Sequence, residues 1–431
     1  MFRKVLLLTV IGLLFAAADL QAEPCSVGWD GGGDGRHWND PANWDPNIVP
    51  DNDGYTFNVG IHGGEVALYQ DRTINLLNCF GDVELGPTYG HVRLTLTGVG
   101  LTNNGELNII AWGAQLFDIN GNVTNKSLAR LDLWGARIGG DLMNEAEGMV
   151  EVNGEVGIKG DFDNAGIVIA ADELDVENLI SNIGQIKIYG GGCGGNVLDN
   201  DSNGVITGFG SIYGIKGLGN EGTIYGNGGP LVVVTGTEGA LINDGTMGNA
   251  AMASMNIMHY GIGVPSDVNN SGRIEVNAGG GVSFDCNLVN KPNGVIELLG
   301  GTLSATTITQ SADANFAGFG SITGDILIES GAKIELTGPT NIVGDVNIPV
   351  GATLEISDGQ TLITGHTTCD GTIHLIGGTV IFQGGCDSEN CDIINEAGKD
   401  RNHFDINADG IENFKDFAEF ADEWLWKASW Y

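Results

Sequence analysis

Short alternating apolar strands recur along most of this chain, and turns containing asparagine separate them. The segments Gly184–Ile188, Gly272–Val276 and Gly294–Leu298 share one pattern, in which aliphatic and polar residues alternate. A period of two places the aliphatic side chains on one face of a strand and the polar side chains on the other. Five-residue strands cannot bury a core alone, so we expect them to stack on one another.

The asparagines in the turns set the length of the repeat, because they recur at a nearly regular interval. They are Asn104, Asn125, Asn144, Asn164, Asn182, Asn200, Asn220, Asn243, Asn270 and Asn290. This interval predicts an all-β fold, a right-handed parallel β-helix of about 20 residues per coil. Asparagines stacked at one corner of such coils are expected to hydrogen-bond from coil to coil.

Residues 1–22 have the pattern of a signal peptide. Arg3 and Lys4 precede an apolar run from Val5 to Ala18, and Ala22 is a plausible cleavage edge. No later segment approaches the length and apolar character of a transmembrane helix. We therefore expect an exported protein, secreted or on the cell surface, without a transmembrane segment in the mature chain.

Residues 23–54 differ from the repeat, since three tryptophans, Trp29, Trp38 and Trp44, lie among turn-forming residues. The run from Trp38 to Trp44 resembles the W-x-N-P-x-N-W entry element of secreted bacterial β-helix proteins of the adhesin and autotransporter-passenger type. That resemblance implies an N-terminal cap, which would cover the open end of the solenoid. Exposed tryptophans that stack on sugar rings are the alternative interpretation.

The β-helix is expected to span residues 55–384, although its turns change in the second half. Gly208–Ile212 recurs as Gly318–Ile322, and the segment beginning at Gly324 recurs one coil later at Gly344. This part is similar to the autotransporter-associated repeat in its G-x-h-x-x-G-A-x-h-x-h form. The similarity implies the same fold and says almost nothing about activity.

A candidate calcium site lies near the C-terminus, in the twelve-residue loop from Asp405 to Asp416. Oxygen-bearing residues occupy loop positions 1, 3, 5, 9 and 12, Gly410 is at the sharp turn, and a carbonyl is available at position 7. The predicted Ca²⁺ ligands are Asp405, Asn407, Asp409, Ile411 through its carbonyl, Asn413 and Asp416. Apolar residues at helical spacing follow, so a small α-helical calcium-loop module is expected over residues 405–431, after a linker over residues 385–404.

The aspartate at position 12 makes this EF-hand-like loop resemble a dockerin type I segment. That resemblance implies a cohesin-like protein as a partner. Dockerins carry two such segments, and this chain shows one.

Net charge and cysteine content limit the partners, disulfides and metal sites expected for this chain. The formal net charge of −37 disfavours nucleic acid and anionic membranes as partners. The 7 cysteines leave at least one unpaired, and Cys386 and Cys391 are close enough in sequence to bridge a small loop. No pair of cysteines has the spacing of a zinc site, so zinc is not predicted.

The sequence favours adhesion or attachment, to a polysaccharide or to a protein partner, over catalysis. A polysaccharide lyase or glycoside hydrolase is the first alternative, because β-helices carry such enzymes, but fold alone is a weak argument. Hydrolysis would need two facing carboxylates, and no catalytic residues are predicted. Arg130 and Arg137 come nearest to a basic cluster, and both are expected to face solvent. A structural cell-envelope protein is the second alternative.

Overall fold

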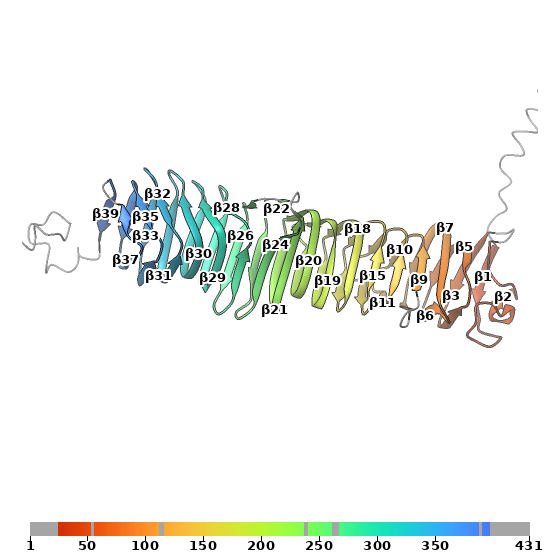
Figure 1. Cartoon of the computed structure of the whole chain (residues 1–431). Coiled ribbons are helices and arrows are strands. Elements are labelled where there is room, and N and C mark those ends of the chain that lie inside the picture. Colours follow the sequence, from red (N-terminus) through yellow and green to blue (C-terminus); the bar gives the residue numbers. More distant parts are fainter. Residues whose placement is uncertain are drawn as a thin grey trace, which may run out of the picture. The chain divides into compact units, whose positions relative to one another are not determined.

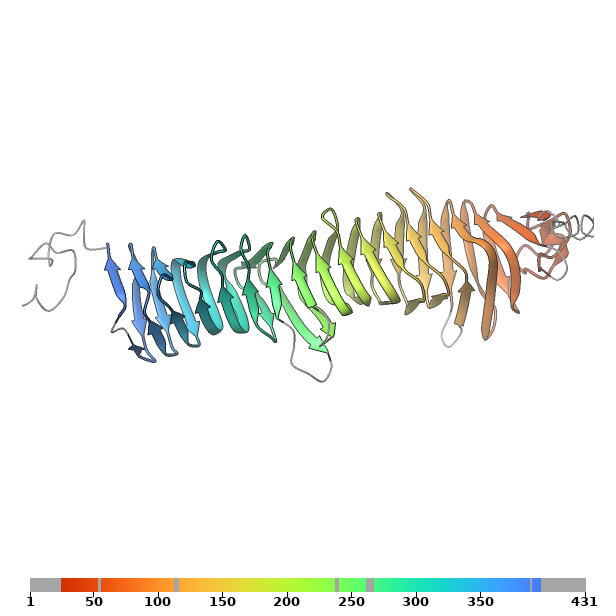
Figure 2. The ribbon, with the colours of Figure 1, turned by 90° about the horizontal axis from the view of Figure 1, so that it is seen from above.

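The computed structural model describes residues 25–52, 56–111, 116–236, 240–260, 267–387 and 390–396. The chain divides into two compact units, residues 1–160 (unit 1) and residues 161–431 (unit 2). Each is an all-β parallel solenoid in which strands stack coil upon coil (Figures 1 and 2). Within the described ranges the one helical element is a 3₁₀ turn, η1, at Pro41–Asn43.

The strands of unit 1 are short and follow one another around each coil. They are β1 (Cys25–Trp29), β2 (Trp44–Asp45), β3 (Phe57–Ile61), β4 (Gly64–Leu68), β5 (Arg72–Cys79), β6 (Asp82–Pro87), β7 (His91–Asn103), β8 (Glu106–Ile110), β9 (Leu116–Asn120), β10 (Val123–Asn125), β11 (Arg130–Trp134), β12 (Ala136–Ile138), β13 (Leu142–Asn144), β14 (Met149–Val152) and β15 (Val156–Ile158).

Unit 2 contains longer strands that bend through a corner and join two sheets. Its strands are β16 (Phe162–Asn164), β17 (Ile167–Ala170), β18 (Glu173–Asn182), β19 (Gln185–Asn200), β20 (Val205–Asn220), β21 (Thr223–Gly236), β22 (Ala240–Asn243), β23 (Thr246–Asn249), β24 (Ser254–Tyr260), β25 (Val268–Asn270), β26 (Arg273–Asn277), β27 (Gly281–Phe284), β28 (Leu288–Asn290), β29 (Val295–Gln310), β30 (Asn315–Ile328), β31 (Lys333–Val343), β32 (Val346–Ile348), β33 (Thr353–Ile356), β34 (Gln360–Ile363), β35 (Thr367–Cys369), β36 (Thr372–Leu375), β37 (Thr379–Phe382), β38 (Cys386–Asp387) and β39 (Asp392–Asn395).

The pairing divides each coil among three parallel sheets. In unit 1, sheet A contains β1, β3, β5, β7, β10 and β13. Sheet B contains β4, β6, β8, β11 and β14. Sheet C contains the first parts of β5 and β7, followed by β9, β12 and β15. The same three-sheet order repeats in unit 2.

The alternation read from the sequence produces the core. Ile186 and Ile188 are fully buried, whereas Lys187 between them is partly exposed. Ile274 and Val276 are likewise buried around the partly exposed Glu275. Burial of aliphatic side chains inside the stack supplies the main stabilising free energy. The prediction of a parallel β-solenoid with about 20 residues per coil is confirmed.

A ladder of buried asparagine side chains follows one corner of the coils. In unit 2 the amide of Asn200 accepts a hydrogen bond from Asn182 at 2.7 Å and donates one to Asn220 at 2.8 Å. The ladder members of unit 2 are Asn164, Asn182, Asn200, Asn220, Asn243, Asn270, Asn290 and Gln310. In unit 1 the ladder runs through Asn103, Asn125 and Asn144. The predicted coil-to-coil bonding of asparagines is confirmed.

One member of the predicted set was wrong, because Asn103 and not Asn104 belongs to the ladder. Asn103 is fully buried and donates to the Oδ1 of Asn125 at 2.8 Å. Asn104 is exposed at the same corner. Successive side chains of a strand point to opposite faces, so only one of two adjacent asparagines can enter the core.

The ladder ends where a neighbouring coil lacks an amide. In unit 1, Asn103 is the register partner of Cys79, a buried thiol. In unit 2, Gln310 accepts from Asn290 but donates to the carbonyl of Ala314 in its own turn. The next position in that column is Ile328. The change in turn sequence after residue 310 therefore accompanies a change from amide to apolar packing at this corner.

Two glycine-rich turns explain the repeated Gly-Phe-Gly-Ser-Ile segments. Gly208 and Gly318 have φ angles of +129° and +128°. A Cβ atom at either glycine would lie 1.9 Å from a carbonyl oxygen of the preceding coil. Only glycine allows this close approach of backbone to backbone.

The three N-terminal tryptophans form one buried cluster. Trp44 is fully buried, and its ring centroid lies 4.9 Å from that of Trp29 and 4.7 Å from that of Trp38. Their strands meet because β1 pairs antiparallel with β2 and parallel with β3. Since Trp29 is also buried, none of the three offers a face to a sugar ring. This geometry supports the interpretation as a cap.

The suggested bridge between Cys386 and Cys391 is wrong, because Cys391 forms a disulfide with Cys369. The two partners are 22 residues apart, which is one coil, so the bond joins neighbouring coils. No helix in the described part of the chain is long and apolar enough to cross a membrane.

The ladder makes a direct prediction for stability. Replacing Asn125 by alanine removes the oxygen that accepts from Asn103 and the N–H group that donates to Asn144. The side chains of both neighbours are buried. Because buried polar atoms without partners are costly, Asn125→Ala should lower the free energy of unfolding by about 2–4 kcal/mol. Urea unfolding followed by tryptophan fluorescence measures this change.

The exposed neighbour provides the control, since Asn104→Ala should alter the free energy of unfolding by less than about 0.5 kcal/mol. Equal effects of the two substitutions would contradict the structural role of the ladder.

Candidate binding surface

Sheet C of unit 1 has a row of charged side chains on its outer face. Arg93 of β7, Asp118 of β9 and Arg137 of β12 are register partners on successive parallel strands. Their outward direction follows from their neighbours, because Phe117 and Ile119 on either side of Asp118 are fully buried. Charged groups from coils far apart in sequence therefore form a line along the stack.

The row borders a hollow of about 230 Å³. Gly157 of β15 is the next register position after Arg137 and carries no side chain. The lining residues are Arg93, Asp118, Ile119, Asn120, Arg137, Gly139 and Lys159. Three cationic side chains thus face one carboxylate, in a chain that has 18 basic and 55 acidic residues in total.

Asp118 organises the beginning of this row. Its Oδ2 atom lies 2.7 Å from Nε2 of His91 and 3.7 Å from the guanidinium of Arg93. Its Oδ1 atom is buried and has no hydrogen-bond partner in the described ranges. The carboxylate therefore holds one side of the hollow in place by its contacts to β7.

Arg137 has a different environment. Its side chain is exposed, and it has no hydrogen-bond or ion-pair partner among the residues that the structure describes. A guanidinium carries five N–H donors in a planar arrangement that fits carboxylate, sulfate or phosphate. Arg137 is therefore the cation of this surface best placed to bind an external anion.

Sheet B of unit 1 carries the opposite charge. Successive strands place acidic or amide residues in one outward register: Glu65, Glu84, Asn108, Asp132 and Glu151. Arg130 lies on this sheet and is already paired, at 2.9 Å from Asp132 and 2.7 Å from Glu151. The two arginines that the sequence grouped together both face outward, but they occupy different sheets and only Arg137 is unpaired within the described residues.

A second hollow, of about 130 Å³, lies near the start of sheet B. Arg36, Glu65 and Glu84 are among its lining residues. Glu65 forms an ion pair with Arg36 at 2.5 Å. Desolvation, together with the charges of Glu65 and Asp82, raises the pKa of Glu84 above its ordinary value, although Arg36 opposes the shift. The two carboxylates thus have different environments on adjacent strands.

The predicted calcium ligands lie outside the described residues. These are Asp405, Asn407, Asp409, Ile411, Asn413 and Asp416. The predicted signal peptide over residues 1–22 and the predicted module over residues 405–431 also lie outside them.

Comparisons with protein-family models, with curated proteins and with solved structures found no match. Function must therefore be inferred from the side chains of this chain.

The sequence itself carries a signal for the row on sheet C. Arg93, Asp118 and Arg137 follow one another at intervals close to one coil, and each has the outward parity of its strand. Grouping charges by proximity in the sequence instead paired Arg137 with Arg130, which belongs to another sheet. Charges in a solenoid must be compared one coil apart.

Proposed function

We propose that this chain is an exported attachment protein that binds an acidic polysaccharide through the row on sheet C of unit 1. The signal-peptide pattern of residues 1–22 supports export, and the Cys369–Cys391 disulfide suits an oxidising, extracytoplasmic location. Right-handed winding of the coils and the C-terminal calcium module belong to the same proposal.

The observation that carries this proposal is Arg137, which has no partner in the described part of the chain and lies beside a hollow, in line with Arg93. These two arginines are two strands apart, which corresponds to roughly 10 Å at the ordinary spacing of parallel strands. A linear polysaccharide lying along the stack would present carboxylates or sulfates at repeated intervals to this row. Arginine binds such groups through paired, charge-assisted hydrogen bonds.

The calcium loop would provide a second attachment. Its predicted ligands, listed above from Asp405 to Asp416, are hard oxygen donors of the kind Ca²⁺ prefers. Through its dockerin-like character the loop would bind a cohesin-like protein, or hold the chain on a cell-surface polysaccharide.

The polysaccharide site is tested by removing the charge of Arg137. Arg137→Gln should weaken binding to polygalacturonate by roughly 10–100-fold, the value of one or two charge-assisted hydrogen bonds. Calorimetric titration of the purified mature chain measures the affinity, which should also fall as salt is raised. Gly157→Leu should weaken binding too, because a side chain there would enter the hollow; its Cβ would meet only Cγ of Arg137, at 3.8 Å.

A matched control exists on the other sheet. Arg130→Gln changes the net charge by the same amount, but Arg130 is already paired with Asp132 and Glu151. Its affinity for polygalacturonate should equal that of the native chain. Equal losses of affinity in the Arg130 and Arg137 variants would show that the effect comes from the overall charge. That result would refute a site on sheet C.

The calcium loop is tested at its first ligand. Asp405→Ala should weaken Ca²⁺ binding by at least about tenfold, because one of few charged ligands is lost. Calorimetry with Ca²⁺ measures this, and retention on cells or on a cohesin-like partner should fall in parallel. Asp392→Ala, an acidic residue of β39 outside the loop, should leave both unchanged. Unaltered retention of Asp405→Ala would refute the attachment role.

A glycoside hydrolase is the second candidate, favoured by the paired carboxylates of sheet B. Hydrolysis requires a protonated acid and a second carboxylate; the pKa of Glu84 is raised, and its register partner Glu65 is paired with Arg36. This function predicts release of reducing sugar that Glu84→Gln abolishes. Its rate should fall as the pH rises through the raised pKa of Glu84, because the acid loses its proton. Absence of product from a panel of plant and algal polysaccharides, at saturating protein, would eliminate this candidate.

A further inference from the structure

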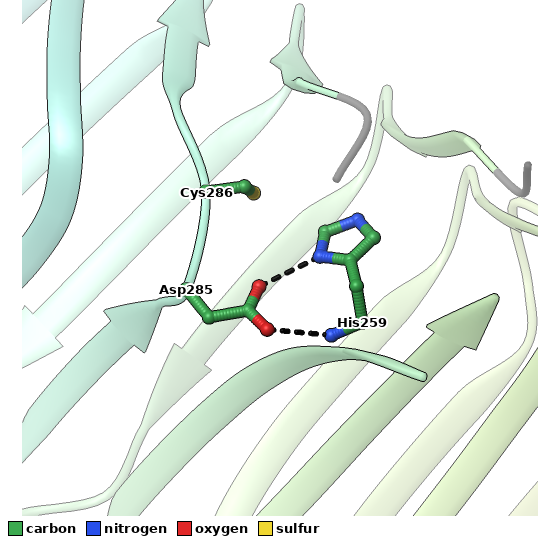
Figure 3. A group of neighbouring side chains, drawn as sticks. All are labelled: His259, Asp285 and Cys286. Atoms are coloured by element: carbon green, nitrogen blue, oxygen red, sulfur yellow. Dashed lines mark hydrogen bonds and ion pairs between the residues drawn. The ribbon is translucent and has the colours of Figure 1, made fainter. Parts of the chain in front are cut away.

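A histidine, an aspartate and a cysteine meet at one corner of unit 2 (Figure 3). His259 is near the end of β24, while Asp285 and Cys286 follow β27 in the next coil. The pairing of Ile257 with Phe284 brings these positions together. One possible ligand atom from each of the three residues lies within 4.8 Å of the other two.

Asp285 fixes the orientation of His259 through two contacts. Its Oδ1 atom lies 2.7 Å from Nδ1 of the imidazole, and its Oδ2 atom accepts the backbone N–H of His259 at 2.7 Å. Both contacts are drawn in Figure 3. This carboxylate and this ring nitrogen are therefore close enough to bind one ion together.

The other ring nitrogen of His259 has no hydrogen-bond partner among the described residues. The side chain is 1% exposed, and Nε2 is buried without a hydrogen bond within the described ranges. Thr235, the register partner of His259 on β21, has a buried hydroxyl that is also unpartnered there. Buried polar atoms are nearly always satisfied, so these two atoms mark a corner whose polar groups the described residues leave without partners.

Cys286 supplies a sulfur atom to the same group. It is 5% exposed, and burial raises the pKa of its thiol to about 11. A divalent cation would displace the thiol proton and bind the thiolate.

We propose that His259, Asp285 and Cys286 bind one divalent transition-metal ion of the Zn²⁺ type. Imidazole nitrogen, thiolate sulfur and carboxylate oxygen are the donors that zinc sites use, and three protein ligands leave a fourth position for water. Calcium takes oxygen ligands alone, so sulfur and nitrogen distinguish this site from the loop at residues 405–416. The ion would join two successive coils, and the inference does not depend on polysaccharide binding.

Cobalt(II) provides the probe, because a cobalt–thiolate bond has a charge-transfer absorption that an oxygen-only site cannot produce. The full mature chain, freed of metal with a chelator, should bind one equivalent of Co²⁺ with this absorption, and Zn²⁺ should remove it. Cys286→Ser should abolish the band. His259→Ala and Asp285→Asn should each weaken Co²⁺ binding at least about tenfold.

Two variants separate this site from the other thiols and the calcium loop. Cys25→Ser removes an exposed thiol elsewhere in the chain, and Asp405→Ala removes a calcium ligand; both should keep the cobalt band. Circular dichroism melting without metal shows whether each variant is folded. No cobalt–thiolate band in the native chain, or an undiminished band in Cys286→Ser, would overturn the proposal. The result with the native chain is decisive even where a variant fails to fold.

Discussion

The structure of each unit depends on satisfying buried amides from one coil to the next. An asparagine inside a stack of strands has two N–H donors and a carbonyl acceptor, all removed from water. In the ladder, one donor bonds to the next asparagine and the other to a backbone carbonyl, as for Asn125 with Met149. A shift of the strand by one residue would expose the amide and bury its neighbour. The ladder therefore defines the strand register more strictly than the aliphatic core alone does.

The parts of the fold that follow from periodicity could be read from the sequence. The coil length and the inward aliphatic positions depend on local alternation, which every coil repeats. The assignment of Asn104 was wrong because two adjacent asparagines look alike until the parity of the strand is known. The disulfide partner of Cys391 was missed for a related reason, since the correct residue lies one coil away, whereas the suggested one is a near neighbour in the sequence.

Sites on a solenoid are hidden from motif searches because their residues are separated by whole coils. His259 and Cys286 belong to successive coils, so a search for closely spaced zinc ligands could not find them. The proposed calcium loop is the opposite case, because its predicted ligands are neighbours in the sequence and a local pattern is enough to propose them. In unit 1 the outward column of sheet B is mostly carboxylates, whereas that of sheet C has one arginine on either side of Asp118.

The ladder also bears on how such a chain can change its length. Each interior asparagine offers the same acceptor to the coil before it and the same donor to the coil after it. Loss of residues 183–200 would place Asn182 next to Asn220, and the joint would have the same hydrogen bond as before. Duplication or deletion of whole coils therefore leaves no unsatisfied amide. An insertion of a few residues would leave one without its partner, unless the inserted residues bulge outside the corner. This protein can therefore gain or lose whole coils during evolution, a change that would disrupt the core of most globular proteins.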